Sequence, residues 1–185
     1  MKKKIGIVTP YKGYNFGTSL QAYALKSFIE GLGFESYLIG RKNTISKGRD
    51  VSIKKLGIML LRGCRRPNVF KKTFFSYKTN LSKPLSEQTK KQFLEFTDTL
   101  NIHHHTMKEL KEISKKDEFV LFVCGSDQIW NATNLYQDPL YFLEFAPTEK
   151  RVSFAPSFGK SFIPEYNINP IYRKIKMFKS LSCRE

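Results

Sequence analysis

The residues best suited to chemistry lie together at positions 125–131, in the run Gly-Ser-Asp-Gln-Ile-Trp-Asn. Hydroxyl, carboxylate and amide groups hydrogen-bond to sugar hydroxyls, and the indole of Trp130 offers a flat face to a sugar ring. The run follows five apolar residues, 119–123, which predict a buried strand. Since ligands of open α/β sheets bind where strands end, we interpret the run as a candidate binding turn. An equally good interpretation is a tight turn in which Trp130 fills the core and Asp127 caps the next helix.

Two more polar turns follow predicted strands. Residues 4–8 predict a strand, and residues 9–17 a loop rich in Gly, Pro and Asn that leads into a helix. The free N–H groups of that helix N-terminus favour an anion, although the spacing matches no dinucleotide or phosphate-loop fingerprint. A plain connecting turn is the alternative. The third turn, 156–159, follows a predicted strand at 151–155. Three such turns at one sheet edge predict a polar cleft.

Predicted strands and helices alternate along the chain, which indicates an α/β fold with a parallel sheet and right-handed crossovers. The expected strands are 4–8, 34–39, 119–123 and 151–155, with another beginning at 180–183, and the expected helices are 18–31, 107–114 and 171–179, with one or two more in the basic segment, interrupted at Pro67 and Pro84. On the helix at 18–31, helical spacing predicts an inner face made of Leu20, Tyr23, Ala24, Phe28 and Leu32.

The net charge of +16 is concentrated in one part of the chain. Residues 41–91 hold 15 Lys and Arg against two acidic residues, a local net of +13, which leaves only +3 for the rest. Within this segment, residues 53–66 resemble a basic amphipathic helix that lies on an anionic membrane surface or faces an anionic partner. A solvated helical face is the third interpretation. No nucleic-acid-binding signature accompanies the charge, so we expect no specific nucleic-acid partner.

Three features bear on compartment and metal content. No apolar stretch is long enough to span a bilayer, and the N-terminal residues do not form a signal peptide, so we expect a cytoplasmic protein, with peripheral contact at the inner membrane face through 53–66. The three cysteines are widely spaced and predict neither a disulfide framework nor a zinc site. The histidines at 103–105 are consecutive and cannot all face one ion, so we predict a polar loop and no metal.

Several motifs together resemble those of the polysaccharide pyruvyl transferase family. The resemblance extends over the whole chain, with the motifs in the expected order. The matching segments are 4–9, 14–17, 20–25, 125–131, 141–143, 152–159 and 181–185. One departure is Thr18, since some relatives have an acidic residue at this place after the glycine of the first loop.

The resemblance implies a glycosyltransferase-B-like architecture with two Rossmann-like lobes around a cleft. Residues 1–185 would form the N-terminal lobe, with the basic segment 41–91 inserted, and the C-terminal lobe of the family would be missing. We therefore expect a fragment or truncated product that has little transferase activity alone and that self-associates through the face left open.

The implied reaction moves a pyruvyl group from phosphoenolpyruvate onto hydroxyls of a cell-surface or exopolysaccharide precursor, presented as a sugar or lipid-linked oligosaccharide. Phosphoenolpyruvate is the donor substrate, and no cofactor is expected. Asp127 would orient or deprotonate the acceptor, and Arg184 would clamp the donor oxyanions. The predicted substrate-binding residues are Asn15, Gly17, Thr18, Gln21, Gly125, Ser126, Gln128, Trp130, Asn131, Ser157 and Gly159.

Two other functions stay open. The same two-lobed scaffold also hosts glycosyltransferases that use nucleotide sugars, and fold alone does not decide between them. A lobe of this kind could also be a non-catalytic module that binds anionic glycans or anionic surfaces.

Overall fold

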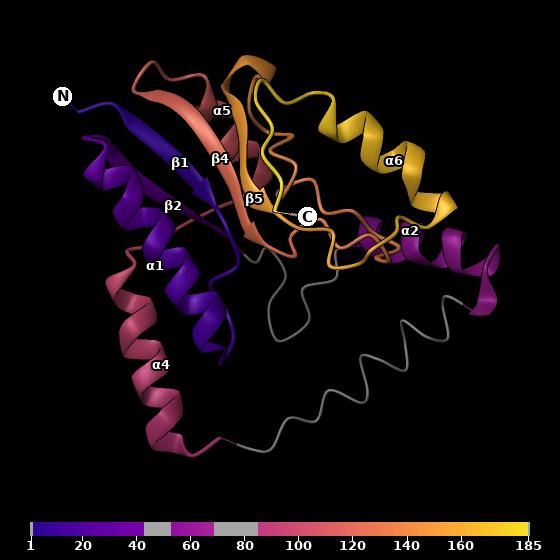
Figure 1. Ribbon diagram of the computed structural model, residues 1–185, viewed down its shortest axis with the longest axis horizontal. Coiled ribbons are helices and arrows are strands. Elements are labelled where there is room, and N and C mark those ends of the chain that lie inside the picture. The colour runs from indigo at the N-terminus through magenta and orange to yellow at the C-terminus, as the bar shows by residue number, and fades with distance from the viewer. Residues whose placement is uncertain (1, 43–52, 69–84, 185) are drawn as a thin grey trace.

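Five parallel strands form the centre of the protein (Figure 1). The computed structural model describes residues 2–42, 53–68 and 85–184. The strands are β1 (Lys4–Val8), β2 (Glu35–Arg41), β3 (His103–His105), β4 (Phe119–Asp127) and β5 (Arg151–Pro156), in the spatial order β3-β2-β1-β4-β5. This order is that of the Rossmann-like sheets. The predicted α/β fold with a parallel sheet and flanking helices is confirmed.

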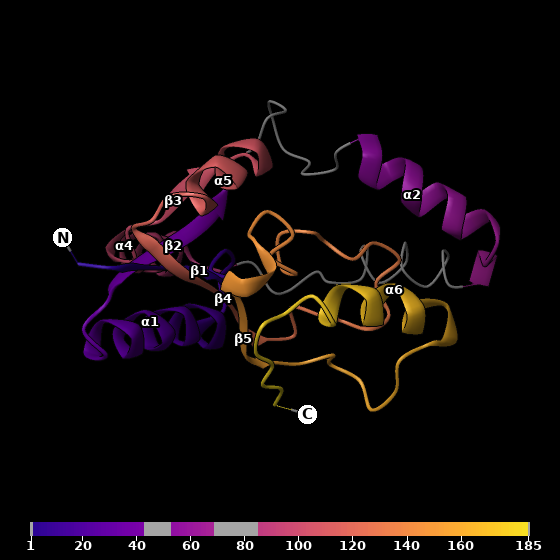
Figure 2. The ribbon, with the colours of Figure 1, turned by 90° about the horizontal axis from the view of Figure 1, so that it is seen from above.

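Helices cover both faces of the sheet. They are α1 (Phe16–Gly31), α2 (Ile53–Cys64), α4 (Glu87–Thr99), α5 (Met107–Ser114) and α6 (Glu165–Ile175), with a short 3-10 helix, η1 (Thr148–Lys150). Figure 2 shows α1 on one side of the sheet and α5 on the other. The protein therefore has three layers, and α2 lies with α6 at the end away from α1.

The hydrophobic residues of the strands divide between two cores. On β1, Ile5 and Ile7 face α1, whereas Val8 belongs to the core on the other side. Gly6 is also on that second side, where a Cβ atom would overlap the ring of Phe122. Glycine at this position therefore lets an aromatic ring of β4 lie across β1.

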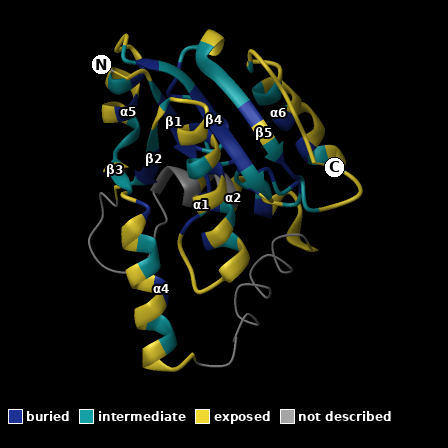
Figure 3. Cartoon of the chain, turned by 60° about the vertical axis from the view of Figure 1, so that its left-hand side comes forward, coloured by how far each residue is buried: buried dark blue, intermediate teal, exposed yellow. Residues whose placement is uncertain are grey.

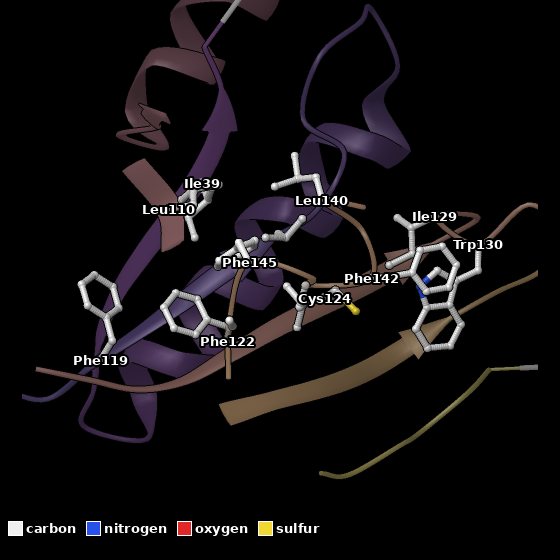
Figure 4. Packing of buried hydrophobic residues seen from close by; sticks show 13 residues of the cluster. Ile39, Leu110, Phe119, Phe122, Cys124, Ile129, Trp130, Leu140, Phe142 and Phe145 are labelled. Atoms are coloured by element: carbon white, nitrogen blue, oxygen red, sulfur yellow. The ribbon is translucent and has the colours of Figure 1, made fainter. Parts of the chain in front are cut away.

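The second core is rich in aromatic residues (Figure 4). The rings of Trp130 and Phe142 stack with their centroids 5.5 Å apart, and Phe122 meets Phe145 edge to face at 5.1 Å. Burial of each such side chain contributes about 1.5–3 kcal/mol. The irregular segment 129–146 is held in place by this packing, with α5 beside it.

Side-chain caps mark the starts of three helices. Asn15 accepts the N–H of Thr18 at the start of α1, and Ser86 accepts that of Thr89 at the start of α4. At α5, Thr106 and Glu109 form a reciprocal capping box. Each cap satisfies an N–H that the helix leaves unpaired, which explains why these helices begin where they do.

The predicted inner face of α1 is wrong. The helix packs on the sheet through Ser19, Ala22, Leu25 and Ile29, whereas Leu20, Tyr23, Ala24, Phe28 and Leu32 are exposed. The helix has apolar residues on both sides, and the sheet accepts the side with the smaller residues, which permits a closer approach. The larger rings pack elsewhere: Phe28 stacks on Phe154 of β5, and Tyr23 contacts Phe96 of α4. Figure 3 shows the exposed residues on α1 and α4.

The predicted polar loop at the three histidines is also wrong, because these residues form β3 at the edge of the sheet. Residues on a strand alternate between its two sides. His103 stacks on Tyr37 at 3.9 Å and His105 hydrogen-bonds the Tyr37 hydroxyl at 2.8 Å, while His104 lies near Tyr11. Burial lowers the pKa of both His103 and His105.

Residues 180–184 run along the outer side of β5. The predicted strand at 180–183 is reduced to a single parallel bridge between Val152 and Ser180. Beyond it, the hydroxyls of Ser153 and Ser182 take over the hydrogen bonds, with Ser153 Oγ donating to the Ser182 carbonyl at 2.8 Å. The last helix, α6, begins six residues earlier than predicted and ends four residues earlier. Pro84 and most of the basic segment lie outside the described residues.

Candidate functional site

The spatial order of the strands places a switch point between β1 and β4, where the chain connections leave in opposite directions. Crevices at such points are where ligands of this fold bind. Gln21 of α1 joins the two strand ends: its Nε2 donates to Thr9 Oγ1 at 2.8 Å and to the Pro10 carbonyl at 3.1 Å. Its Oε1 accepts from Ser126 Oγ at 2.7 Å. Gln21 and Ser126 therefore fix the crevice walls.

The turn after β4 is tightly packed. Gly125 has φ +131°, and a Cβ atom there would overlap the carbonyl oxygen of Phe154, so no other residue fits. Asp127 has φ +78°, and its carboxylate accepts the N–H of Gln128 at 2.8 Å. The backbone carbonyl of Asp127 accepts the N–H of Ser157 at 2.9 Å, which joins this turn to the one after β5.

Trp130 is part of the core, so the prediction that its ring holds a sugar is wrong. The side chain is 1% exposed and stacks on Phe142. Its Nε1 donates to the carbonyl of Tyr141 at 2.9 Å. Asn131 is likewise engaged within the chain, since its side-chain oxygen accepts from the Thr133 N–H and hydroxyl. Trp130 therefore acts by holding the backbone of Tyr141.

The turn after β5 is also supporting structure. Ser157 is 0% exposed and its hydroxyl accepts the N–H of Gly159 at 2.9 Å. Gly159 lies against Gln128, where an added Cβ atom would come within 2.6 Å of the amide oxygen. The predicted direct contact between Ser157 and a substrate is therefore wrong. Its role is to shape the turn beside Asp127.

The first loop and the C-terminal segment supply the outer predicted residues. Asn15, at the exposed start of α1, has its side-chain oxygen 3.2 Å from the Thr18 nitrogen, and Gly17 is exposed beside it. Arg184 is exposed near the carboxyl end of β5, where its N–H donates to the Pro156 carbonyl at 3.1 Å. Substrate contacts by Asn15, Gly17, Thr18 and Arg184 stay predictions.

The predicted convergence of the polar turns is confirmed by these hydrogen bonds. Gln21 connects the first loop to the β4 turn, and the Ser157 backbone connects the β4 turn to the β5 turn. The convergence, however, produces a packed framework rather than an open cleft.

An open cavity lies beside this framework, at the carboxyl ends of β1 and β2. Its volume is about 160 Å³. Aromatic or charged residues make up half of the lining, which consists of Val8, Thr9, Pro10, Tyr11, Lys12, Ile39, Arg41, Asp138, Leu140 and Tyr141. We call this cavity the Tyr11–Tyr141 pocket. Thr9 and Pro10 are held by Gln21, and Tyr141 is held by Trp130, so the predicted residues support its walls.

Opposite charges meet inside this pocket. Arg41, at the end of β2, forms an ion pair with Asp138, whose carboxylate also accepts the Leu140 N–H at 3.0 Å. Burial raises the pKa of the Tyr141 hydroxyl, and the negative charge of Asp138 raises it further. The turn after β4 adjoins the pocket, because Gln21 connects Ser126 to Thr9, which lines the cavity.

The remaining polar groups sit on the loop after β1. The Tyr11 hydroxyl hydrogen-bonds His104 Nε2 at 3.1 Å, and the Lys12 ammonium lies 5.8 Å from the centre of the Tyr11 ring. Aromatic faces combined with a fixed ion pair can hold a ring-shaped ligand rich in hydroxyls.

The sequence interpretation missed Arg41, Asp138 and Tyr141 as pocket residues. Two signals were present: Arg41 lies just beyond the predicted strand at 34–39, and Tyr141 belongs to one of the motifs that carried the resemblance. Neither signal predicts that β2 pairs with β1, and the pocket forms only because these two strands are adjacent.

A second cavity, of about 260 Å³, lies between α1 and α4 and has almost entirely apolar walls, including Phe16, Leu20, Phe93 and Phe96. Ser19 also lines it, and its hydroxyl is the one buried side-chain polar atom without a hydrogen bond in the described ranges 2–42, 53–68 and 85–184. Such walls expose few of the hydrogen-bonding groups that a saccharide needs and no charged group, so the Tyr11–Tyr141 pocket is the better site.

Comparison with protein families identifies the chain. The family model for polysaccharide pyruvyl transferase matches residues 15–185. The chain belongs to the polysaccharide pyruvyl transferase family. No curated protein and no solved structure matches it. The resemblance seen in the sequence motifs is thereby confirmed, and the chain is assigned to a family of transferases.

Two further observations concern this member of the family. In the part of the chain that the structure describes, no three His, Cys, Asp or Glu side chains gather as metal ligands. Within the same residues, no helix combines the length and the apolar character required to cross a membrane.

Proposed function

We propose that this member of the polysaccharide pyruvyl transferase family moves a pyruvyl group from phosphoenolpyruvate onto hydroxyls of a sugar in a cell-surface or exopolysaccharide precursor, and that the acceptor sugar binds in the Tyr11–Tyr141 pocket. Family membership supports the reaction. The observation that supports the acceptor site is the pocket itself, in which two tyrosines and an ion pair surround a small cavity.

The size of the pocket suits a single sugar ring. Drug-sized ligands occupy pockets of roughly 300–1,000 Å³. At about 160 Å³, the pocket is smaller than this range and accommodates one ring, while the rest of a saccharide would extend into solvent. Aromatic side chains pack against the apolar C–H faces of sugars, and Tyr11 and Tyr141 both line the cavity.

The charged pair suits the hydroxyls of that ring. The carboxylate of Asp138 can accept hydrogen bonds from sugar hydroxyls, and the guanidinium of Arg41 can donate them. Asp127, in the adjoining turn, is the second carboxylate available as a general base. Because the Asp127 side chain is partly exposed and is held by the Gln128 N–H, it can face a bound hydroxyl.

The reaction requires no cofactor. The methylene carbon of phosphoenolpyruvate takes up a proton and one sugar hydroxyl bonds to the adjacent carbon. A second hydroxyl then displaces inorganic phosphate and closes a cyclic ketal, and both hydroxyl protons pass to bases. The cationic Arg184, near the carboxyl end of β5, is our candidate for holding the donor phosphate and carboxylate.

Saccharide binding tests the acceptor site and is measured first, because it does not depend on the donor. Saturation-transfer NMR of the full chain with a panel of methyl hexosides is expected to show binding of at least one of them. Asp138→Asn is expected to weaken that binding about tenfold, since one hydrogen bond to a charged group is lost. Asp117→Asn, an exposed aspartate just before β4 at the opposite end of the sheet, is the matched control and should change nothing.

Mass spectrometry tests the reaction. The chain is incubated with the bound hexoside and phosphoenolpyruvate. The yield is expected to be low, because little transferase activity is expected of this lobe alone, and any product should gain the mass of one pyruvate ketal while phosphate is released. A gain in mass that requires a nucleotide sugar instead would identify a glycosyltransferase. If no hexoside binds, or if Asp138→Asn binds as tightly as the unmodified chain, the acceptor site is wrong.

A further inference from the structure

Helix α2 is attached to the rest of the protein through its arginines. Arg62 Nη1 donates to the carbonyl of Leu135 at 2.9 Å and lies 3.4 Å from the side-chain oxygen of Asn167. Asn167 is fully buried in α6, and its amide nitrogen donates to the carbonyls of Ala132 and Asn134. This side of α2 therefore rests on a fixed surface.

A second arginine strengthens the same attachment. The guanidinium of Arg66 lies 4.8 Å from the centre of the Tyr166 ring, in a cation–π contact. Tyr166 in turn donates its hydroxyl to the Thr133 carbonyl. Two of the positive charges that the sequence placed on an amphipathic surface are thus used in contacts within the protein.

Two leucines of α2, Leu60 and Leu61, lie away from these contacts. Leu60 is 47% exposed and Leu61 is 66% exposed, and Cys64, one turn after Leu60, is exposed as well. Residues two apart on a helix point in nearly opposite directions, so Leu60 faces away from the surface that Arg62 contacts. Figure 2 shows α2 at the rim of the molecule, beside α6.

The segment that carries these leucines has charges of a single sign. Residues 53–66 contain five Lys and Arg and no acidic residue. After Arg62 and Arg66 are assigned to contacts within the protein, Arg65 is exposed next to the leucines. Apolar side chains bordered by cations, with no anion among them, are typical of helices that lie in the surface of an anionic bilayer.

We propose that the outward side of α2, with Leu60, Leu61, Cys64 and Arg65, is a docking surface for an anionic lipid bilayer. The leucines enter the boundary between headgroups and acyl chains, and Arg65 pairs with lipid phosphate. Arg62 and Arg66 orient the helix from behind. The proposal stands on the contacts of α2 and its charge, and it does not depend on the acceptor or the reaction proposed above.

Co-sedimentation with vesicles tests the proposal. The full chain is expected to sediment with phosphatidylcholine vesicles that contain phosphatidylglycerol, and not with phosphatidylcholine alone. The double variant Leu60→Ser, Leu61→Ser is expected to bind on the order of tenfold more weakly, because two apolar side chains no longer leave water. Leu94→Ser, at a leucine of α4 that is 57% exposed, is the matched control and should bind as the unmodified chain does.

A charge variant separates the electrostatic attraction between Arg65 and the lipid from the insertion of the leucines. Arg65→Glu is expected to weaken binding severalfold at low salt, and the difference should shrink as salt is added. The wild-type arginines Arg62 and Arg66 are kept in all variants, since their replacement would detach α2 from α6. Circular dichroism of each variant should match that of the unmodified chain.

A probe on Cys64 locates the contact. Cys183→Ser leaves Cys64 as the exposed thiol, because Cys124 is buried and burial raises the pKa of its thiol. An environment-sensitive dye on Cys64 is expected to shift to the blue with the anionic vesicles. Sedimentation without this shift would mean that another segment binds lipid, and the proposal would be wrong.

Two further results would also overturn it. One is a chain that stays in the supernatant with both kinds of vesicle. The other is equal binding by the double leucine variant together with binding to a soluble anionic polysaccharide, which would identify an anionic glycan as the partner.

Discussion

The two halves of the sheet's carboxyl edge differ in packing. On the β4–β5 side, Asp127, Ser157 and Gly159 are joined by hydrogen bonds, and Gly125 lies directly against the Phe154 carbonyl, so little space is left. On the β1–β2 side, a cavity of about 160 Å³ opens among Tyr11 and its neighbours. The recognisable motif therefore marks the packed half, and the space for a ligand lies in the other half.

We call the β4–β5 side the packed half and the β1–β2 side, with its cavity, the hollow half. Hydrogen bonds from the packed half and from α1 hold the walls of that cavity. Trp130 holds the carbonyl of Tyr141, and Gln21 holds Thr9 from one side and Ser126 from the other. A binding cavity needs walls that do not move when a ligand enters, and these hydrogen bonds provide such walls. Variants on the two sides should therefore have different effects, on stability in one half and on binding in the other.

The largest effect is expected at Trp130. Trp130→Ala should lower the free energy of unfolding by about 3–5 kcal/mol, because it empties a large volume in the core. Trp130→Phe keeps the stack on Phe142 and removes the hydrogen bond to Tyr141, so it should cost less and still weaken saccharide binding. Urea denaturation and NMR titration measure the two effects. Equal destabilisation by both variants would contradict this division of roles.

Gly125→Ala comes next, with an expected loss of about 3 kcal/mol, because φ +131° is strained for alanine and its Cβ atom would overlap the Phe154 carbonyl. Gly31→Ala is the control, since Gly31 ends α1 with nothing within 4 Å of an added Cβ atom. That variant should be neutral or slightly more stable. A Gly125→Ala protein that unfolds at the same urea concentration as the unmodified chain would show that the turn is not tightly packed.

In the hollow half, Arg41→Gln should act mainly on binding. Loss of the guanidinium removes a charged donor from the Tyr11–Tyr141 pocket, and affinity for the saccharide should fall about tenfold, or about 1.4 kcal/mol. Gln128→Ala, at an exposed position of the packed half, should leave affinity unchanged. Calorimetric titration measures both. The opposite ranking would place the ligand at the β4 turn.

The smallest effect concerns pH. Burial lowers the pKa of His103 and His105 below 6.5 in the folded chain, so the unfolded chain takes up protons first as pH falls. Stability should be fully present above about pH 6.5 and decline below it. Hydrogen exchange should show this weakening at β2 and β3 before β4 and β5. In His105→Gln, the decline with pH should be shallower, and an unchanged slope would assign the effect to other groups.

Local sequence signals were enough to predict most of the elements. Apolar runs predicted β1 and β4, and the expected helix at 107–114 is α5. The start of α1 was predicted two residues late, because Asn15 and not a residue at 18 or 19 caps the helix. The same signals failed on α1, because two sides of this helix are apolar and either could face the sheet. Packing selected the side with Ala22. The local signals also failed at β3, because histidine has little preference for strands. This strand forms because it pairs with β2, which is distant in the sequence.

The sequence predicted at which edge of the sheet the candidate site lies, but not which side chains line it. Parallel strands imply that polar turns meet, and Gln21 and Ser126 do meet. The sequence does not contain the distance between Arg41 and Asp138, which are brought together only when β2 lies next to β1. Burial of Trp130 likewise depends on Phe142, which contacts it from a segment without regular structure.

The central place of β1 has a consequence for synthesis of the protein on the ribosome. β1 pairs with β2 early, but its other neighbour is β4, where Ile7 meets Val123. At roughly 5–20 residues per second, translation leaves that edge of β1 without its partner for on the order of 10 s. During this interval, the nascent chain exposes an unpaired apolar strand, which is a site where molecular chaperones act.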